Sequence, residues 1–157
     1  MSRAAKTVII IISIVYAVVV ASTFVSDRLI AAAFRQGNIS FSLEEKLSLT
    51  EKAIELDPLS AELYFKKFIV LQEMRISTGK RKPHKTELYA IKNAIDLRPL
   101  WPKYHLYYGL VLEKMSPNPN IMTRNIILSQ LKKAAELKPY SEMYGREYLK
   151  YLEKYGD

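Results

Sequence analysis

The chain contains no cysteine among its 157 residues. This absence excludes disulfide bonds, thiolate metal sites, a cysteine nucleophile and lipids attached through cysteine. Glycine is also sparse, with 5 residues, and the 7 prolines fall mainly between periodic segments, which is typical of helical proteins. Because 49% of the residues are hydrophobic, the chain can bury a core, and its length suffices for one compact domain plus a short appendage.

Charge is almost absent from the first 26 residues, which hold no acid and only two basic residues, Arg3 and Lys6. Residues 7–26 are uncharged, and residues 8–20 are almost wholly aliphatic. About 20 such residues suffice to cross a bilayer as a helix, which satisfies its own backbone hydrogen bonds. We therefore expect a transmembrane anchor. A cleaved signal peptide ending near Ala21 and a buried core helix are the alternatives.

The flanking charges indicate an orientation for this anchor. Two basic residues, Arg3 and Lys6, precede the uncharged run, and two others, Arg28 and Arg35, follow it, so the free amino terminus and Asp27 tip the balance. Basic residues favour the cytoplasmic side, so we expect the N-terminus inside and the rest of the chain outside the cytoplasm. The predicted organisation is a cytoplasmic stub and transmembrane helix over residues 1–27, followed by a helical domain over residues 28–157. In a bacterium this would be a single-pass protein of the inner membrane.

Histidine is scarce as well, with His84 and His105 as its two instances. Neither lies in a metal-ligand spacing, and the sequence has no glycine-rich phosphate loop, serine elbow or paired-carboxylate motif. We therefore expect no enzyme, no cofactor and no metal site, and we expect His105 to have a structural role.

A six-residue pattern occurs three times: alanine, a small or apolar residue, an acid, leucine, a charged residue and proline. The copies are residues 53–58, 94–99 and 134–139, so that successive prolines lie 41 and 40 residues apart. Each proline ends a helix, because the residue before it is pushed out of helical geometry. An amphipathic run follows each proline, with Ser60 and Ser141 as expected N-caps. The pattern predicts three helix pairs: 43–57 with 61–74, 85–98 with 103–115, and 121–138 with 142–155.

These repeats resemble tetratricopeptide repeats, which carry W-x2-L-G-x2-Y in the first helix and A…P at the end of the second. Gly109 matches the small residue that lets the two helices of a repeat touch. The resemblance covers roughly residues 28–157, with residues 29–35 as a degenerate first helix and a family-like turn at 36–38. It implies an all-α fold, a short α-solenoid of helix-turn-helix repeats. The first-helix positions are His105, Tyr108, Gly109 and Leu112 in one repeat and Tyr64, Lys67, Phe68 and Leu71 in the preceding one, where Lys67 and Phe68 depart from the pattern.

The resemblance also implies a binding surface, because first helices in this family line a concave groove that receives peptides or partner helices. It makes Tyr64, Lys67, Tyr104 and Tyr107 the partner-binding candidates. A further tyrosine stripe at helical spacing lies near the end of the chain, and we expect it to pack against the preceding helix rather than to bind a partner. The stripe comprises Tyr144, Tyr148, Tyr151 and Tyr155.

The densest positive cluster is a basic loop with Lys80, Arg81, Lys82 and Lys85. The simpler interpretation is a solvated loop, and the functional one is contact with anionic lipid or an acidic partner. Because no aromatic residues are interleaved with these charges, we expect no nucleic-acid binding.

Together these features predict a membrane-anchored adaptor or scaffold that binds protein partners. Small anchored tetratricopeptide proteins that resemble this one accompany bacterial machines for polysaccharide export, pili and secretion, so the resemblance implies a machine of this kind. The alternative is an accessory single-pass subunit whose transmembrane helix packs into a larger complex through the small residues Ala17, Ala21 and Ser22.

Overall fold

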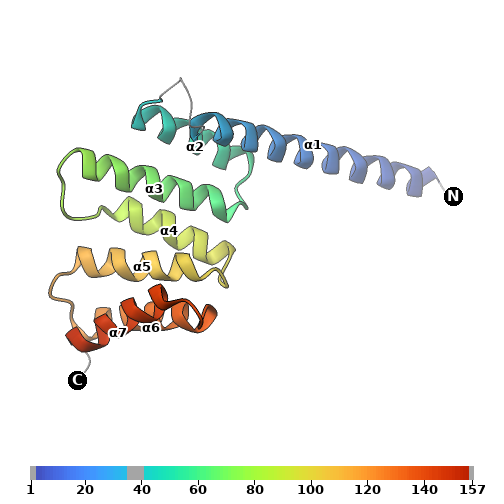
Figure 1. Ribbon diagram of the computed structural model, residues 1–157. Coiled ribbons are helices and arrows are strands. Elements are labelled where there is room, and N and C mark those ends of the chain that lie inside the picture. Colours follow the sequence, from blue (N-terminus) through green and yellow to red (C-terminus); the bar gives the residue numbers. More distant parts are fainter. Residues whose placement is uncertain (1–2, 35–40, 156–157) are drawn as a thin grey trace. The chain divides into compact units, whose positions relative to one another are not determined.

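The computed structural model of the chain describes residues 3–34 and 41–155. Throughout these residues the regular structure is helical, which confirms the predicted all-α class. The chain divides into two compact units, the first ending at Leu59 and the second beginning at Ser60. The helices are α1 (Arg3–Phe34), α2 (Leu43–Leu56), α3 (Ala61–Ser77), α4 (Lys85–Leu97), α5 (Pro102–Met115), α6 (Ile121–Leu137) and α7 (Glu142–Tyr155) (Figure 1).

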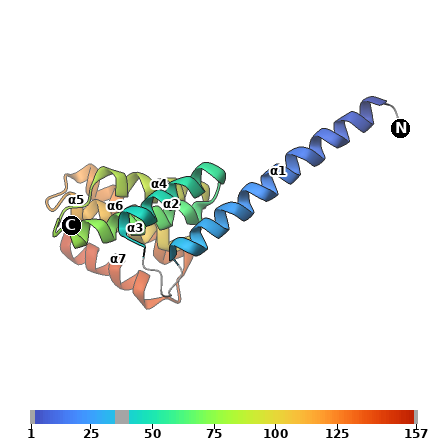
Figure 2. The ribbon, with the colours of Figure 1, turned by 90° about the horizontal axis from the view of Figure 1, so that it is seen from above.

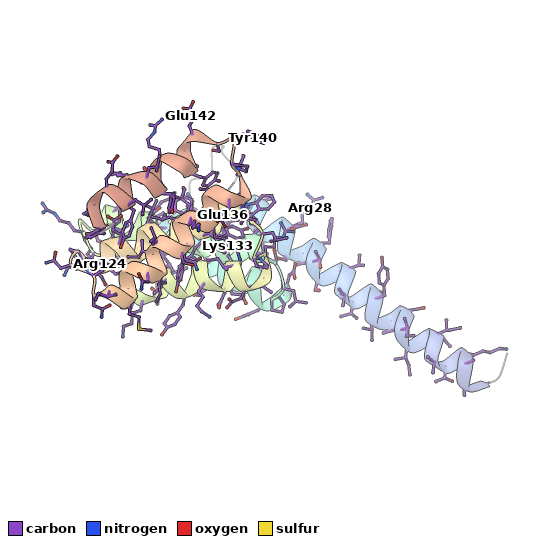
Figure 3. The ribbon with its side chains drawn as sticks, turned by 90° about the horizontal axis from the view of Figure 1, so that it is seen from below. Arg28, Arg124, Lys133, Glu136, Tyr140 and Glu142 are labelled. Atoms are coloured by element: carbon purple, nitrogen blue, oxygen red, sulfur yellow. The ribbon has the colours of Figure 1, made fainter. Side chains whose placement is uncertain are left out.

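Helix α1 has two parts with different surroundings. It contains 32 residues and is therefore roughly 48 Å long. From Val8 to Val25 its large apolar side chains are 46–71% exposed, and they project from all sides of the helix (Figure 3). Near its C-terminal end Ser26, Ile30 and Ala33 are buried, at a spacing that places them on one face. One helix thus carries both the uncharged run and a packed segment.

The packed segment of α1 lies against α2 within the first unit. The Ser26 hydroxyl donates a hydrogen bond to the Ala53 carbonyl of α2 at 3.2 Å. The expected degenerate first helix at residues 29–35 begins as the last part of α1 rather than as a separate helix. Arg35 and the expected turn at residues 36–38 lie outside the described residues. Helix α1 continues without a break through Asp27 and Arg28.

The three prolines of the repeated pattern act through the same backbone geometry. The residues that precede them, Asp57 and Arg98, both have φ −136° and ψ 76°, and Lys138 has φ −142° and ψ 68°. The proline ring excludes helical geometry at the preceding residue, so α2, α4 and α6 end one residue earlier than predicted. The recurrence of this geometry confirms that the sequence pattern is a structural repeat.

The helix N-termini differ from the prediction. Ser60 is the N-cap residue of α3, as predicted, but its side chain makes no capping hydrogen bond. Reciprocal capping boxes, which the sequence analysis missed, form instead between Ser42 and Glu45 at α2 and between His84 and Glu87 at α4. In each box the glutamate side chain returns to accept from the backbone N–H of the cap residue.

In the second unit, each of the helices α3 to α7 packs against the next along the chain (Figures 1 and 2). Gly109 of α5 faces α6 so closely that a Cβ atom there would lie 2.9 Å from Leu131 Cδ2, which confirms its expected place at a close helix crossing. His105 is buried, with Nδ1 2.7 Å from Gln130 Oε1 and Nε2 2.7 Å from the Pro99 carbonyl oxygen. Both ring nitrogens therefore have structural partners, as expected.

Candidate functional site

Four aromatic rings meet between α3 and α5. Phe65 and Phe68 come from α3, Tyr104 and Tyr107 come from α5, and the contacting ring centroids lie 5.2 to 5.8 Å apart. The rings are tilted against each other at a spacing that favours attraction between aromatic groups. In each helix the two residues are three positions apart and so project from one face. We call these four residues the aromatic cluster.

Tyr104 is the buried base of the aromatic cluster, with 0% of its surface exposed. Its hydroxyl donates a hydrogen bond to Glu62 Oε2 at 3.3 Å. Burial, together with the nearby Glu62 carboxylate, raises the pKa of Tyr104 to about 12, because both disfavour the phenolate. Since this side chain has no exposed surface, it supports the neighbouring residues and is not itself available to a partner.

The outer side of the aromatic cluster carries charge. The Lys103 ammonium lies 4.2 Å from the centroid of the Phe65 ring, a cation–π contact. Tyr107 is half-buried and rests on both phenylalanines. A cation, a tyrosine hydroxyl and an aromatic face thus lie together, which is the composition favoured at protein interfaces. Phe65 itself is buried. We call Lys103 and Tyr107, which lie over its ring, the cluster rim.

The other two predicted partner-binding residues lie on a different face of α3. Tyr64 is half-buried and packs against the core of the second unit, and Lys67 is half-buried as well. Each immediately precedes a residue of the aromatic cluster, and one residue along a helix turns by about 100°. The structure therefore brings Tyr104 and Tyr107 together but leaves Tyr64 and Lys67 beside them, on the adjacent face.

The sequence analysis missed Phe65 and Lys103. Their signal was available, because the aromatic pair at 65 and 68 has the same spacing of three as the pair at 104 and 107. Aligning the repeats on the prolines placed Tyr64 and Lys67 in register with His105 and Tyr108 instead, and so hid this correspondence.

A buried ion pair stabilises the backbone of the basic loop. Arg75 Nε lies 3.1 Å from Glu87 Oε1, with 10% and 2% of the two side chains exposed. The same guanidinium donates through Nη1 to the carbonyl oxygens of Lys80 and Arg81 at 3.2 and 3.3 Å. The backbone of the loop is thereby fixed, while its basic side chains are exposed to solvent. These are Lys80, Arg81, Lys82 and, at the start of α4, Lys85.

The tyrosine stripe of α7 packs as predicted. Tyr144 and Tyr151 are buried against α5 and α6, and Tyr148 and Tyr155 are partly buried in the same cluster.

A cleft of about 380 Å³ lies between α6 and α7. Tyr151 is among the residues that line this cleft, and its hydroxyl is buried without a hydrogen-bond partner among the described residues. The cleft is lined by Ile121, Arg124, Asn125, Leu128, Tyr151, Leu152 and Tyr155.

Comparison with known proteins identifies the fold. No protein-family model matches the sequence, and no curated protein matches it. Among solved structures the chain is similar to the first tetratricopeptide domain of Spaghetti (RPAP3), which was solved bound to the HSP90 peptide SRMEEVD. The TM-score is 0.58 at 13% sequence identity, over 87% of this chain and 91% of that one. The chain therefore has a tetratricopeptide-like fold, as the repeated proline pattern predicted.

Proposed function

We propose that the chain is a single-pass membrane adaptor whose helical repeats bind a protein partner. One observation carries the membrane part of this proposal, namely the exposure of apolar side chains on every side of the uncharged part of α1. About 20 residues in this state match the hydrocarbon thickness of a bilayer, whereas water would hydrate the same surface unfavourably. Residues 7–26 are the proposed span, and the repeats occupy the chain from residue 28 onward.

The partner-binding part of the proposal is supported by the fold and by the cluster rim. Tetratricopeptide-like domains present first helices to partners, and the similar structure of the Spaghetti (RPAP3) domain holds a peptide. The proposed contact surface here consists of the cluster rim, Lys103 and Tyr107, with Tyr64 and Lys67 on the adjacent face of α3. Tyr104 supports it from below.

The biological setting follows from the anchor and the charge distribution. We propose an orientation with the C-terminal domain outside the cytoplasm, because the free amino terminus and Asp27 tip the balance of the flanking charges. The resemblance to small anchored tetratricopeptide proteins of bacteria supports an inner membrane as the location. Tethering raises the effective concentration of the repeats towards membrane partners. A membrane-associated machine such as those for polysaccharide export, pili or secretion is the proposed destination.

Two measurements on the full-length chain test the anchor. The protein should stay in the membrane fraction through alkaline carbonate washing, because a spanning helix is not released by removing peripheral contacts. N-terminal sequencing should find residues before Ala21 still attached. A mature chain that begins near Ser22 would identify the run as a cleaved signal peptide instead.

Site-specific photocrosslinking tests the partner surface. A photoreactive phenylalanine analogue at Tyr107, and separately at Tyr64 and Lys67, should crosslink one defined protein in intact membranes. Tyr89 on α4 is the matched control, since it is an exposed tyrosine outside the proposed surface. Equal crosslinking from Tyr89 and Tyr107, or none from any of the proposed positions, would remove this surface as the binding site.

An anchor exchange separates the adaptor from an accessory subunit. When residues 7–25 are replaced by an unrelated membrane-spanning sequence, an adaptor keeps its crosslink at Tyr107. A subunit that packs through its transmembrane helix loses its complex under the same change. The replacement leaves Ser26 in place, so that its hydrogen bond to Ala53 is preserved.

A further inference from the structure

Large apolar side chains are exposed at both proline turns of the second unit. Leu100 is 72% exposed and Trp101 45% exposed between α4 and α5, and Tyr140 is 100% exposed between α6 and α7 (Figure 3). Turns normally carry polar residues, and water solvates three side chains of this size poorly. A residue type that is unfavourable in water but recurs at equivalent turns indicates a surface that meets something other than water.

The two turns lie at the same end of the second unit (Figure 1). Helices α5 and α6 are antiparallel neighbours, since Gly109 faces Leu131 and the earlier residue Leu106 shares a core cluster with the later residue Ala134. The N-terminal end of α5 therefore lies beside the C-terminal end of α6. We call Leu100, Trp101 and Tyr140, with the basic residues Arg98 and Lys138, the turn edge.

Two exposed basic residues belong to the turn edge. Arg98 and Lys138 are exposed, and the Arg98 guanidinium lies 5.9 Å from the centroid of the Trp101 ring. The acids that flank the turns in sequence are each engaged in an ion pair within their own helix: Asp96 with Lys92 at 3.1 Å, Glu136 with Lys132 at 3.7 Å, and Glu142 with Arg146 at 3.8 Å. The turn edge thus combines tryptophan, tyrosine and leucine with exposed arginine and lysine. These residue types are enriched in protein segments that lie at a membrane–water interface.

The first unit also exposes a large apolar side chain after its proline, close to the proposed membrane span, with Asp57 in the position that Arg98 and Lys138 occupy in the second unit. Pro58 is followed by Leu59, which is 78% exposed. The C-terminal end of α2, just before this turn, lies beside Ser26 through the hydrogen bond from Ser26 to Ala53. Ser26 is the last residue of the uncharged run. The proposed span would leave the bilayer near Ser26, and the C-terminal end of α2 lies beside Ser26. The exposed Leu59 follows this end of α2.

We propose that the turn edge inserts into the interfacial layer of a bilayer that contains anionic lipid, so that the repeats lie on the membrane instead of hanging free from it. This inference rests on the proposed membrane anchor. The tether keeps the second unit within reach of the surface, so that a few apolar and basic side chains suffice to hold it there. The exposed first-helix surface of α3 and α5 then has a fixed orientation relative to the membrane.

The basic loop is the competing lipid contact, and it lies at the opposite end of α4 from the turn edge. Helix α4 begins at Lys85, beside the basic loop, and ends at Leu97, beside the turn edge. Its 13 residues separate the two surfaces by roughly 20 Å. The exposed Ile121, which begins α6, lies at the same end as the basic loop, because α6 ends at the turn edge. Probes at the two ends therefore report different membrane contacts.

Trp101 is the single tryptophan of the chain and serves as the probe. We would reconstitute the full-length protein in vesicles of phosphatidylcholine and phosphatidylglycerol, with and without lipids that carry a spin label near the headgroup. Loss of Trp101 emission with the labelled lipid, and a smaller loss when phosphatidylglycerol is omitted, is the expected result. The variant Trp101→Phe/Tyr140→Trp should show the same loss. The matched control Trp101→Phe/Ile121→Trp should keep its emission.

Each other outcome has a defined meaning. If carbonate washing removes the chain from the vesicles, the anchor is wrong and this inference fails with it. If the chain stays but neither Trp101 nor the tryptophan of Tyr140→Trp is quenched, the anchor stands and the turn edge does not meet lipid. Quenching of the Ile121→Trp probe alone would assign the lipid contact to the basic loop. In the supported case, Arg98→Glu/Lys138→Glu should reduce the quenching of Trp101.

Discussion

Gly109 and Gly145 are both helical glycines, but they meet very different surroundings. A Cβ atom at Gly109 would lie 2.9 Å from Leu131 Cδ2 and 3.0 Å from Leu131 Cγ, whereas a Cβ atom at Gly145 would have nothing within 4 Å. Glycine carries the same intrinsic penalty in any helix. The two positions therefore separate close packing from helix propensity.

We predict that Gly109→Leu destabilises the protein by about 1–3 kcal/mol or more, because a bulky side chain forces α5 and α6 apart. Gly145→Leu is the matched control, and it should change stability by less than about 1 kcal/mol, in the stabilising direction. Urea unfolding of both variants measures the difference. Equal stability of the two variants would show that α5 and α6 tolerate separation.

Tyr104 provides a prediction about pH. Its pKa is raised to about 12, so the folded state holds the neutral phenol more tightly than the unfolded chain does. The resulting stability is fully present below pH 10 and is lost as the pH rises from about 10 towards 12. We predict that Tyr104→Phe removes one late-titrating tyrosine from the ultraviolet titration and lowers stability at neutral pH by about 1 kcal/mol, through loss of the hydrogen bond to Glu62. Tyr140→Phe, at a fully exposed tyrosine, is the control and should do neither.

At the scale of elements, the loop between α3 and α4 depends on the Arg75–Glu87 pair. Glu87 accepts from Arg75 and also from the His84 backbone N–H, while Arg75 holds two loop carbonyl oxygens. One pair therefore joins the end of α3, the basic loop and the cap of α4. This explains how a loop dense in positive charge keeps a fixed path.

We predict that Glu87→Ala destabilises the second unit by about 3 to 5 kcal/mol, because it leaves the Arg75 guanidinium buried without its counter-charge. The double variant Arg75→Met/Glu87→Leu should lose less, since no uncompensated charge remains. Asp96→Ala, which breaks an exposed pair with Lys92, should cost less than about 0.5 kcal/mol. Chemical unfolding gives these three values. The single variants Arg75→Met and Glu87→Leu complete a double-mutant cycle, and losses of these two that add up to the loss of the double variant would contradict the coupling.

At the scale of the whole molecule, α1 joins an apolar run to a packed segment without an intervening linker. The buried residues Ser26, Ile30 and Ala33 cover α2, so α1 contributes to the fold as well as to the proposed anchor. The charge pattern alone predicts a domain boundary after Asp27. Such a boundary assigns Ser26 to the anchor, although the Ser26 hydroxyl donates a hydrogen bond to the Ala53 carbonyl of α2.

We predict that a fragment of residues 26–157 is soluble, predominantly helical and monomeric or weakly associating, because it drops the exposed apolar run but keeps the segment that covers α2. Circular dichroism and sedimentation measure both properties. A shorter fragment of residues 41–157 should melt at a lower temperature, since it exposes the α2 face that α1 covers. A strong β signal from the longer fragment, or equal melting temperatures, would contradict this account.

Several features could be predicted from the sequence because their causes are local. The uncharged run at residues 7–26 fixes a long apolar helix through composition alone. The three prolines end α2, α4 and α6 through steric clashes with their immediate neighbours, so their positions located the helix ends to within one residue. The position of Gly109 within the repeat was enough to predict that it lies at a helix crossing, because equivalent positions of a structural repeat have similar packing.

Only the tertiary structure decided which side chains are covered and which reach solvent. Tyr104 and Tyr107 are three residues apart on one helix, but α3 covers Tyr104 completely and leaves Tyr107 half-exposed. Tyr64 and Phe65 are adjacent, but the turn of about 100° between them leaves Tyr64 half-buried and buries Phe65. The Arg75–Glu87 pair joins residues twelve positions apart, through a loop whose path no local preference sets. Burial and pairing depend on the neighbouring helix, and periodicity within one helix does not specify that neighbour.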